Sequence, residues 1–142
     1  HPAMSKPVYL LDRDILSDLV RRPAGRIREC IAERGEDSVC TSIVVAAELR
    51  FGAAKKGSAR LSAQLEAVLD AFDILPFEEP ADRHYGDIRT ALERAGTPIG
   101  ANEMLIAAHA LALGLTLVTN NTGEFRRVVG LRVENWLDQR AG

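Results

Sequence analysis

The chain alternates between short, continuously apolar runs and longer segments in which apolar residues recur at helical spacing. Residues 8–11 form an apolar run that starts with β-favouring side chains, which is typical of a strand buried on both faces. Similar short runs predict further strands over residues 38–41, 74–75, 115–119 and 131–136. Strands that alternate with helices favour a parallel sheet covered by helices. The predicted fold class is therefore α/β.

The segments between these runs carry the spacing and the end signals of helices. Residues 15–20 predict a short helix after the first strand, and Ser42 can cap a helix that reaches about Ala54. Further helices are predicted between Pro23 and Gly35, after Ser58, and between Pro80 and Gly96. Residues 104–113 are apolar nearly all round and Asn102 is a good N-cap, so this helix should be central and buried.

Length and composition indicate one globular domain. At 142 residues the chain can bury a sizeable core, and 46% hydrophobic with 27% charged residues is ordinary for such a protein. The formal net charge of −2 excludes a global attraction to nucleic acid, so such binding would need local basic patches. Residues 1–3 resemble what remains of a cleaved tag, and we expect the domain to occupy residues 4–142, starting at Met4.

The two cysteines and the hydropathy bear on the cellular compartment. Cys30 and Cys40 lack C-x-x-C spacing and are interpreted as reduced core thiols rather than as a disulfide or a metal site. No apolar run reaches the length of a membrane span, and no secretory signal is recognisable. We therefore expect a cytoplasmic protein without a membrane segment.

Two acidic residues interrupt apolar segments. Asp12 directly follows the first predicted strand, and in open parallel α/β sheets ligands bind at the carboxyl ends of the central strands. A carboxylate there is costly to desolvate unless a cation or hydrogen-bond donors compensate. Glu48 interrupts the apolar face of the helix that begins after Ser42, so it is either a ligand or one half of an ion pair with a nearby arginine.

Three further residues are candidates that also have ordinary structural explanations. Glu103 lies in the first turn of the buried helix, where an acid complements the helix dipole. Asn121 and Glu124 follow the fourth predicted strand in the segment TNNTGEF, which is equally typical of a polar turn. What favours a functional interpretation is their joint placement with the first two acids.

The predicted sheet can bring these candidates to one edge. If the first and fourth strands are neighbours, Asp12 and the loop with Asn121 and Glu124 lie side by side, with Glu48 and Glu103 on helices around the same edge. Acids gathered in this way repel one another, and Mg²⁺ relieves the repulsion because it prefers carboxylate oxygens and keeps water molecules. Such a site can activate water and stabilise charge on a phosphodiester.

Basic residues lie close to Glu48 in the sequence. Arg50, Lys55 and Lys56 follow it on the same predicted helix and can contact a nucleic-acid backbone, which would make binding salt-dependent. The alternative is a solvated charged face, which is the usual explanation for a run of charges.

Four segments, in a fixed order, carry a family resemblance. They read YLLDRDILSDL, TSIVVAAELRFGA, IGANEMLIAAHALALGLTLVTNNTGEF and LRVENWL. The chain from Met4 onward resembles PIN-domain ribonucleases, specifically VapC-type toxins of bacterial toxin–antitoxin modules. The resemblance implies one PIN-like domain with a five-stranded parallel sheet flanked by helices on both faces. It also implies RNA cleavage that depends on Mg²⁺ or Mn²⁺, a homodimer, and neutralisation by a VapB-type antitoxin.

Carried over by position, the resemblance assigns the functional residues. Its catalytic acids fall on Asp12, Glu48, Glu103 and Glu124, and its metal ligands on Asp12, Glu48, Glu103 and Asn121. RNA-binding residues are expected at Arg50, Lys55 and Lys56.

The chain departs from the family pattern at two places. Relatives usually have Asp-Thr-Asn where this chain has Asp12, Arg13 and Asp14, and they usually have Asp where it has Glu103. Two alternatives follow. A D-x-D motif after an apolar strand also matches haloacid-dehalogenase phosphatases, in which the first Asp is a nucleophile. A PIN-like domain that holds RNA or a protein without cutting it is the non-enzymatic alternative.

Overall fold

The computed structural model describes residues 6–137, and the predicted tag at residues 1–3 lies outside them. The strands are β1 (Tyr9–Leu11), β2 (Val39–Ser42), β3 (Asp73–Leu75), β4 (Thr116–Val118) and β5 (Val133–Glu134). The helices are α1 (Arg13–Arg21), α2 (Arg26–Arg34), the 3₁₀ turn η1 (Glu36–Ser38), α3 (Ile43–Lys56), α4 (Ala59–Leu69), α5 (Ala81–Ala95), α6 (Ala101–Leu113) and α7 (Thr122–Phe125). The predicted strands and helices are thus present, with ends shifted by a few residues.

The sheet has five strands in the order β3-β2-β1-β4-β5, and every neighbouring pair is parallel. Leu10 in β1 is opposite Cys40 in β2 on one side and Leu117 in β4 on the other. This register makes β1 the central strand, and Leu10 and Leu11 have no exposed surface. The expectation that the first and fourth strands are neighbours is confirmed, and the five-stranded parallel α/β fold is confirmed with it.

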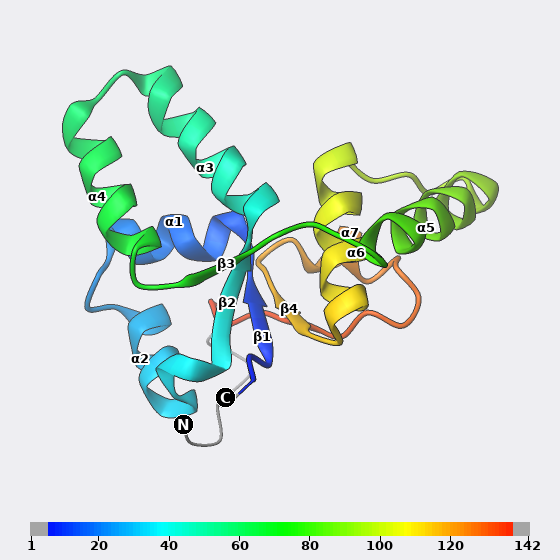
Figure 1. The fold of residues 1–142 in the computed structure, drawn as a ribbon, viewed down its shortest axis with the longest axis horizontal. Helices are drawn as coiled ribbons and strands as arrows, with labels where there is room; N and C mark the ends of the chain where they lie inside the picture. Colours follow the sequence, from blue (N-terminus) through cyan, green and yellow to red (C-terminus); the bar gives the residue numbers. More distant parts are fainter. Residues whose placement is uncertain (1–5, 138–142) are drawn as a thin grey trace.

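Helices cover both sides of the sheet (Figure 1). In this view α1, α2 and α4 lie to the left of the strands, while α5 and α6 lie to the right. The hairpin of α3 and α4 extends away from the carboxyl end of β2, where Ser42 caps α3 by accepting a hydrogen bond from the Val44 N–H, as predicted. No helix among residues 6–137 is long and apolar enough to cross a membrane.

The helix predicted to be buried all round, α6, is buried in its middle part. Six of its residues are buried, namely Met104, Ile106, Ala107, Ala108, His109 and Ala110. Leu113 is nevertheless 46% exposed, so the prediction is wrong at the end of the helix. The helix stops there at the surface, where Gly114 adopts a left-handed conformation with φ 69° and leads into β4.

Two local predictions are wrong. Asn102 is not the N-cap of α6, because the helix begins at Ala101 after Gly100, and the Glu103 carboxylate accepts the Gly100 N–H at 2.9 Å. The segment interpreted as a possible polar turn forms the short helix α7. Its Phe125 is fully buried, and this anchor stabilises a helical turn that the polar residues around it do not predict.

Candidate active site

A cavity of about 380 Å³ opens at the carboxyl end of β1. Its lining consists of Asp12, Arg13, Asp14, Glu48, Gly100, Ala101, Asn102, Glu103, Ile106 and Asn121, and we call it the acidic cavity. These residues come from the start of α1, the middle of α3, the start of α6 and the loop after β4. Four of them are carboxylates and one is a cation, so the cavity attracts positive charge.

Asp12 is the most deeply held of these acids. It is 7% exposed and acts as the N-cap of α1, with Oδ1 accepting the Arg13 N–H at 2.8 Å. Its Oδ2 accepts a 2.7 Å hydrogen bond from the Thr119 hydroxyl, which follows β4. Burial, and then the charge of Asp14, raises the pKa of Asp12 to about 6. Hydrogen bonds thus hold the Asp12 carboxylate in place, although its surroundings destabilise the charged form.

Asp14 lines the same cavity and was not among the predicted site residues. Its Oδ2 accepts the Asn120 N–H at 3.0 Å, while its Oδ1 is buried without a hydrogen-bond partner among residues 6–137. Burial raises the pKa of Asp14 as well. The signal that could have identified it is its spacing, because the second acid of the D-x-D motif lies in the same first helical turn as Arg13.

The ion-pair interpretation of Glu48 is confirmed, and its role as a ligand stays a prediction. Glu48 lines the acidic cavity, and its Oε1 is 3.9 Å from Nε of Arg13. Its Oε2 accepts a 3.1 Å hydrogen bond from the Asn102 side chain on α6. Asn102 therefore orients Glu48 instead of capping its own helix. Both polar contacts come from residues that sequence reasoning did not assign to the site.

Glu103 is held by its own helix and by the loop after β4. Its Oε1 accepts the Gly100 N–H, and its Oε2 accepts a hydrogen bond from Nδ2 of Asn121. The same Asn121 amide donates to Glu124 at 3.3 Å. Burial raises the pKa of Glu103. Glu124 is not among the residues that line the cavity, but it interacts with Glu103 directly and through Asn121.

Three of the four predicted acids, Asp12, Glu48 and Glu103, therefore line one cavity without converging on one point. Among residues 6–137, no three acidic, histidine or cysteine side chains are close enough together to hold a single ion. The geometry does bring Asp12, Asp14, Glu48 and Glu103 into one lining, although these residues are up to 91 positions apart in the sequence (103 − 12).

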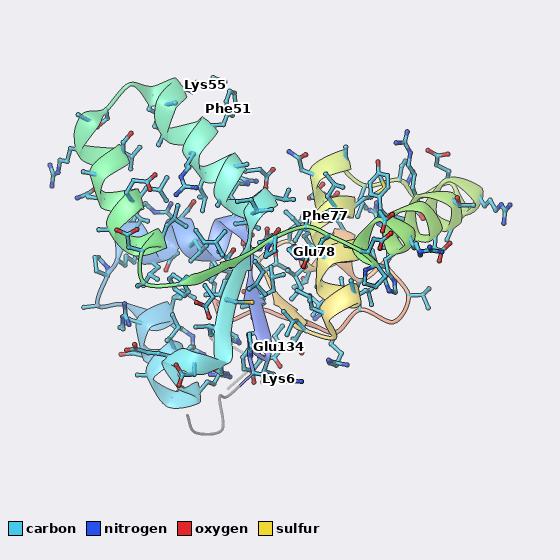
Figure 2. All side chains as sticks on the ribbon, in the orientation of Figure 1. Lys6, Phe51, Lys55, Phe77, Glu78 and Glu134 are labelled. Carbon is cyan, nitrogen blue, oxygen red and sulfur yellow. The ribbon has the colours of Figure 1, made fainter. Side chains whose placement is uncertain are left out.

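The predicted RNA-binding residues lie further along α3. Arg50 forms a two-fold hydrogen-bonded ion pair with Glu66 on α4, at 3.0 and 2.9 Å. Lys55 and Lys56 are exposed in the last turn of α3, and Lys55 lies near the outer end of the α3–α4 hairpin in Figure 2. Lys55 is two helical turns, roughly 10 Å, from Glu48 along the helix.

Comparison with known proteins identifies the fold family. Residues 9–131 match the PIN domain. The chain therefore belongs to the PIN-domain family. Because the match includes the segment that contains Asp12 and Asp14, we do not retain the phosphatase alternative for that segment.

The similar proteins within this family are VapC ribonucleases. The chain is 37% identical over 129 residues to the tRNA(fMet)-specific endonuclease VapC of Shigella flexneri, which covers 90% of this chain and 97% of that protein. It is 35% identical over 131 residues to ribonuclease VapC2 of Rickettsia felis, covering 91% of this chain and 98% of that protein.

Solved structures of VapBC complexes have the same fold. The structure of VapBC2 from Rickettsia felis bound to a promoter DNA fragment superposes with a TM-score of 0.82 at 34% identity, covering 91% of this chain and 98% of that chain. The DNA-bound VapBC from Salmonella typhimurium gives a TM-score of 0.84 at 34% identity, with coverage of 92% and 98%. The resemblance seen in the sequence motifs is confirmed.

Proposed function

We propose that the chain is an endoribonuclease toxin that cleaves RNA with the help of a divalent cation and is neutralised by a VapB-type antitoxin. The observation that carries the proposal is the acidic cavity at the carboxyl end of β1, in a chain 37% identical to a tRNA(fMet)-specific endonuclease. Parallel α/β sheets bind their ligands at this edge. Buried Cys30 and Cys40, both unpaired, support a cytoplasmic location.

The donor set of the acidic cavity suits Mg²⁺ or Mn²⁺. All the candidate ligands that line the cavity are hard oxygen donors. Asp12, Glu48, Glu103 and Asn121 are the ligands that we propose. Asn121 uses its amide nitrogen on two carboxylates, so its amide oxygen is the atom that can bind a cation. A bound cation would supply an activated water and would stabilise charge on the phosphodiester.

The protein's own groups hold this donor set in position. The Thr119 hydroxyl and the Arg13 N–H each donate to a different oxygen of Asp12, which fixes the plane of that carboxylate. Asn102 does the same for one oxygen of Glu48. Such supporting hydrogen bonds orient ligands and typically change metal affinity or activity by about 10- to 100-fold when they are removed.

The antitoxin has a candidate binding site next to the acidic cavity. A second cavity of about 330 Å³ between α1, α3 and α4 shares Arg13 and Glu48 with the first. Its other lining residues are Ser17, Val20, Arg21, Leu49, Gly52, Ala53, Lys56, Leu61 and Leu65. An antitoxin segment with apolar side chains would bury them here, and a neighbouring arginine of that segment would enter the acidic cavity. The solved relatives are VapBC complexes, which supports a protein partner of this kind.

RNA contacts are proposed on the exposed basic side chains of α3. Lys55 and Lys56 are free of ion pairs among residues 6–137, whereas Arg50 must exchange Glu66 for phosphate. Reversing both lysines to glutamate should weaken RNA binding and reduce its salt dependence, and Arg50→Glu should add less. The matched control is Arg60→Glu on α4, an exposed cation that does not line the acidic cavity. Equal RNA affinity before and after the double reversal would refute these contacts.

The decisive experiment is cleavage of defined RNAs by the purified protein. The panel includes initiator tRNA and an elongator tRNA, because one relative is named for tRNA(fMet). We expect cleavage with Mg²⁺ or Mn²⁺, none with EDTA, and none by Asp12→Asn. RNA binding without cleavage under all these conditions would favour the binding-module alternative. The observation that favours this alternative is that both carboxylate oxygens of Glu103 already accept hydrogen bonds, one from the Gly100 N–H and one from the Asn121 side chain.

A further inference from the structure

Asp12 and Asp14 compete for one hydroxyl group. Oγ1 of Thr119 lies 2.7 Å from Oδ2 of Asp12 and 3.4 Å from Oδ2 of Asp14, and the same oxygen accepts the Asn121 N–H at 3.0 Å. A hydroxyl has a single proton to donate, so the shorter contact with Asp12 takes it. The Asn120 N–H is then the strongest donor left to Asp14, and the Ile15 N–H contributes more weakly.

Asp14 is half-buried, and its remaining oxygen, Oδ1, is buried. Its Oδ1 and Nε2 of His109 are the two buried side-chain polar atoms among residues 6–137 that lack a hydrogen-bond partner. The other acids of the cavity are supplied with donors: Glu48 by Asn102 and Glu103 by Gly100 and Asn121. A buried carboxylate oxygen without a donor destabilises the fold unless a cation reaches it.

We infer that Asp14 is a ligand of the divalent cation, beside Asp12, and contributes more to cation binding than Glu103 does. The inference rests on the proposed function only in placing a cation in the acidic cavity. Asp12 caps α1 and Asp14 lies in its first turn, so the backbone places both side chains at the same cavity. Each oxygen of Glu103, like each oxygen of Asp12, already accepts a hydrogen bond, whereas Oδ1 of Asp14 accepts none from residues 6–137.

The pairing agrees with the absence of a tighter cluster. Among residues 6–137, no three candidate ligands converge on one point, but Mg²⁺ is commonly bound by one or two carboxylates together with water molecules and substrate phosphates. Two aspartates that are next-but-one neighbours are therefore sufficient protein ligands. The assignment also gives a role to the one cavity acid that, among residues 6–137, has a buried oxygen without a hydrogen-bond partner.

The test is calorimetric titration of Mg²⁺ and of Mn²⁺ into the purified full chain and its variants, without RNA. Asp14→Asn should weaken binding at least about tenfold, which corresponds to ~1.4 kcal/mol, and more than Glu103→Gln does. Asp87→Asn is the control, because it removes an equal charge on α5, away from the acidic cavity. Wild-type affinity in Asp14→Asn, with a loss in Glu103→Gln, would overturn the inference.

Thermal unfolding separates a ligand from a structural acid. Without metal, Asp14→Asn should melt no lower than the wild type, because it removes a buried charge beside Asp12 while an amide oxygen can still accept the Asn120 N–H. The rise in Tm that Mg²⁺ causes in the wild type should be largely lost. A lower metal-free Tm with an undiminished rise would assign Asp14 a structural role and refute the inference.

The wild type supplies a measurement that needs no variant. Substoichiometric Mn²⁺ should broaden the backbone amide signals of Asp14 and Asn120 more strongly than those of Gly100 and Glu103, because relaxation by the ion falls steeply with distance. The reverse order would refute the inference. If the wild type binds neither cation at millimolar concentration, the proposed metal dependence itself fails. If it binds normally and only the Asp14 tests fail, the proposed function stands without this ligand.

Discussion

The strand β1 is three residues long, and its two ends differ in how their polar groups are paired. At its start, the Tyr9 ring packs edge-to-face on Trp136 with centroids 5.1 Å apart, and the Arg34 guanidinium lies over the Trp136 ring at 4.6 Å. The polar groups there have partners: the Trp136 indole N–H donates to Glu134, and its carbonyl accepts a hydrogen bond from Arg26.

Just beyond the other end of the strand, the polar groups are in excess. Asp12 and Asp14 both lie next to the Thr119 hydroxyl, and burial raises the pKa of both. In the described part of the chain, one oxygen of Asp14 has no hydrogen-bond partner. Packing at the start of β1 stabilises the fold. The acids just beyond its other end destabilise the fold, because their charges are buried close together. This difference indicates which end performs chemistry, because unsatisfied buried charge persists where a ligand resolves it.

The largest expected effect is the loss of cleavage in Asp12→Asn. Replacing the ionised oxygen by an amide removes a cation ligand at the end of a buried strand, and we expect the rate to fall about a thousandfold or more, ~4 kcal/mol. Asn is as good an N-cap as Asp, so α1 should remain intact. Cleavage rates at saturating Mg²⁺ and a circular dichroism spectrum measure the two properties. A fully active, folded variant would remove Asp12 from the site.

At the opposite end of β1, Trp136→Ala should affect stability and leave the chemistry unchanged. Trp136 is 3% exposed, and deleting a buried aromatic side chain costs about 3 kcal/mol. Urea unfolding should show this loss, while the cleavage rate per folded molecule stays that of the wild type. Val129→Ala, at a position that is 91% exposed, is the control with a negligible expected change. A selective loss of activity in Trp136→Ala would contradict the division between the two ends.

The stability of the metal-free protein should depend on pH through Asp12. Because burial raises the folded-state pKa of Asp12 to about 6, the folded chain binds this proton more tightly than the unfolded chain does. The resulting stability is fully present below the unfolded pKa, near 4, and is lost as the pH rises through about 6. The wild type should lose on the order of 2 kcal/mol relative to Asp12→Asn over this range.

Urea unfolding of both proteins with EDTA, at several pH values between about 3 and 8, measures this difference. Asp14 should add to it in the same direction, since its pKa is raised too. If the difference in the free energy of unfolding between wild type and Asp12→Asn stays constant across this pH range, the pKa of Asp12 is not raised in the folded protein.

The smallest expected effect concerns the cation over Trp136. Arg34→Met keeps much of the aliphatic stem and removes the charge that lies over the ring, which should cost about 1 kcal/mol in the free energy of unfolding. Arg34→Lys, which keeps the charge, should recover part of the loss. Cleavage should be unaffected by either change. Equal destabilisation by both would assign the effect to packing and not to the cation.

Much of the fold follows from local pattern. The apolar run that ends at Leu11 indicates a central strand, Ser42 indicates the start of α3, and Gly96 and Gly114 mark helix ends. These signals act over a few residues, where side-chain size and backbone preference dominate. Asp12 belongs to the same group, because an acid at the end of a buried strand stands out in the sequence.

Tertiary structure alone decided which oxygen of which acid has a partner. Asp14 accepts a hydrogen bond from Asn120, 106 positions away, because β1 pairs with β4. Asn102 on α6 donates to Glu48 on α3, 54 positions away, because the two helices lie against each other. Sequence reasoning therefore left out Asp14 and mistook Asn102 for a cap. Local propensity is a property of neighbours along the chain, whereas hydrogen bonding and charge burial are properties of neighbours in space.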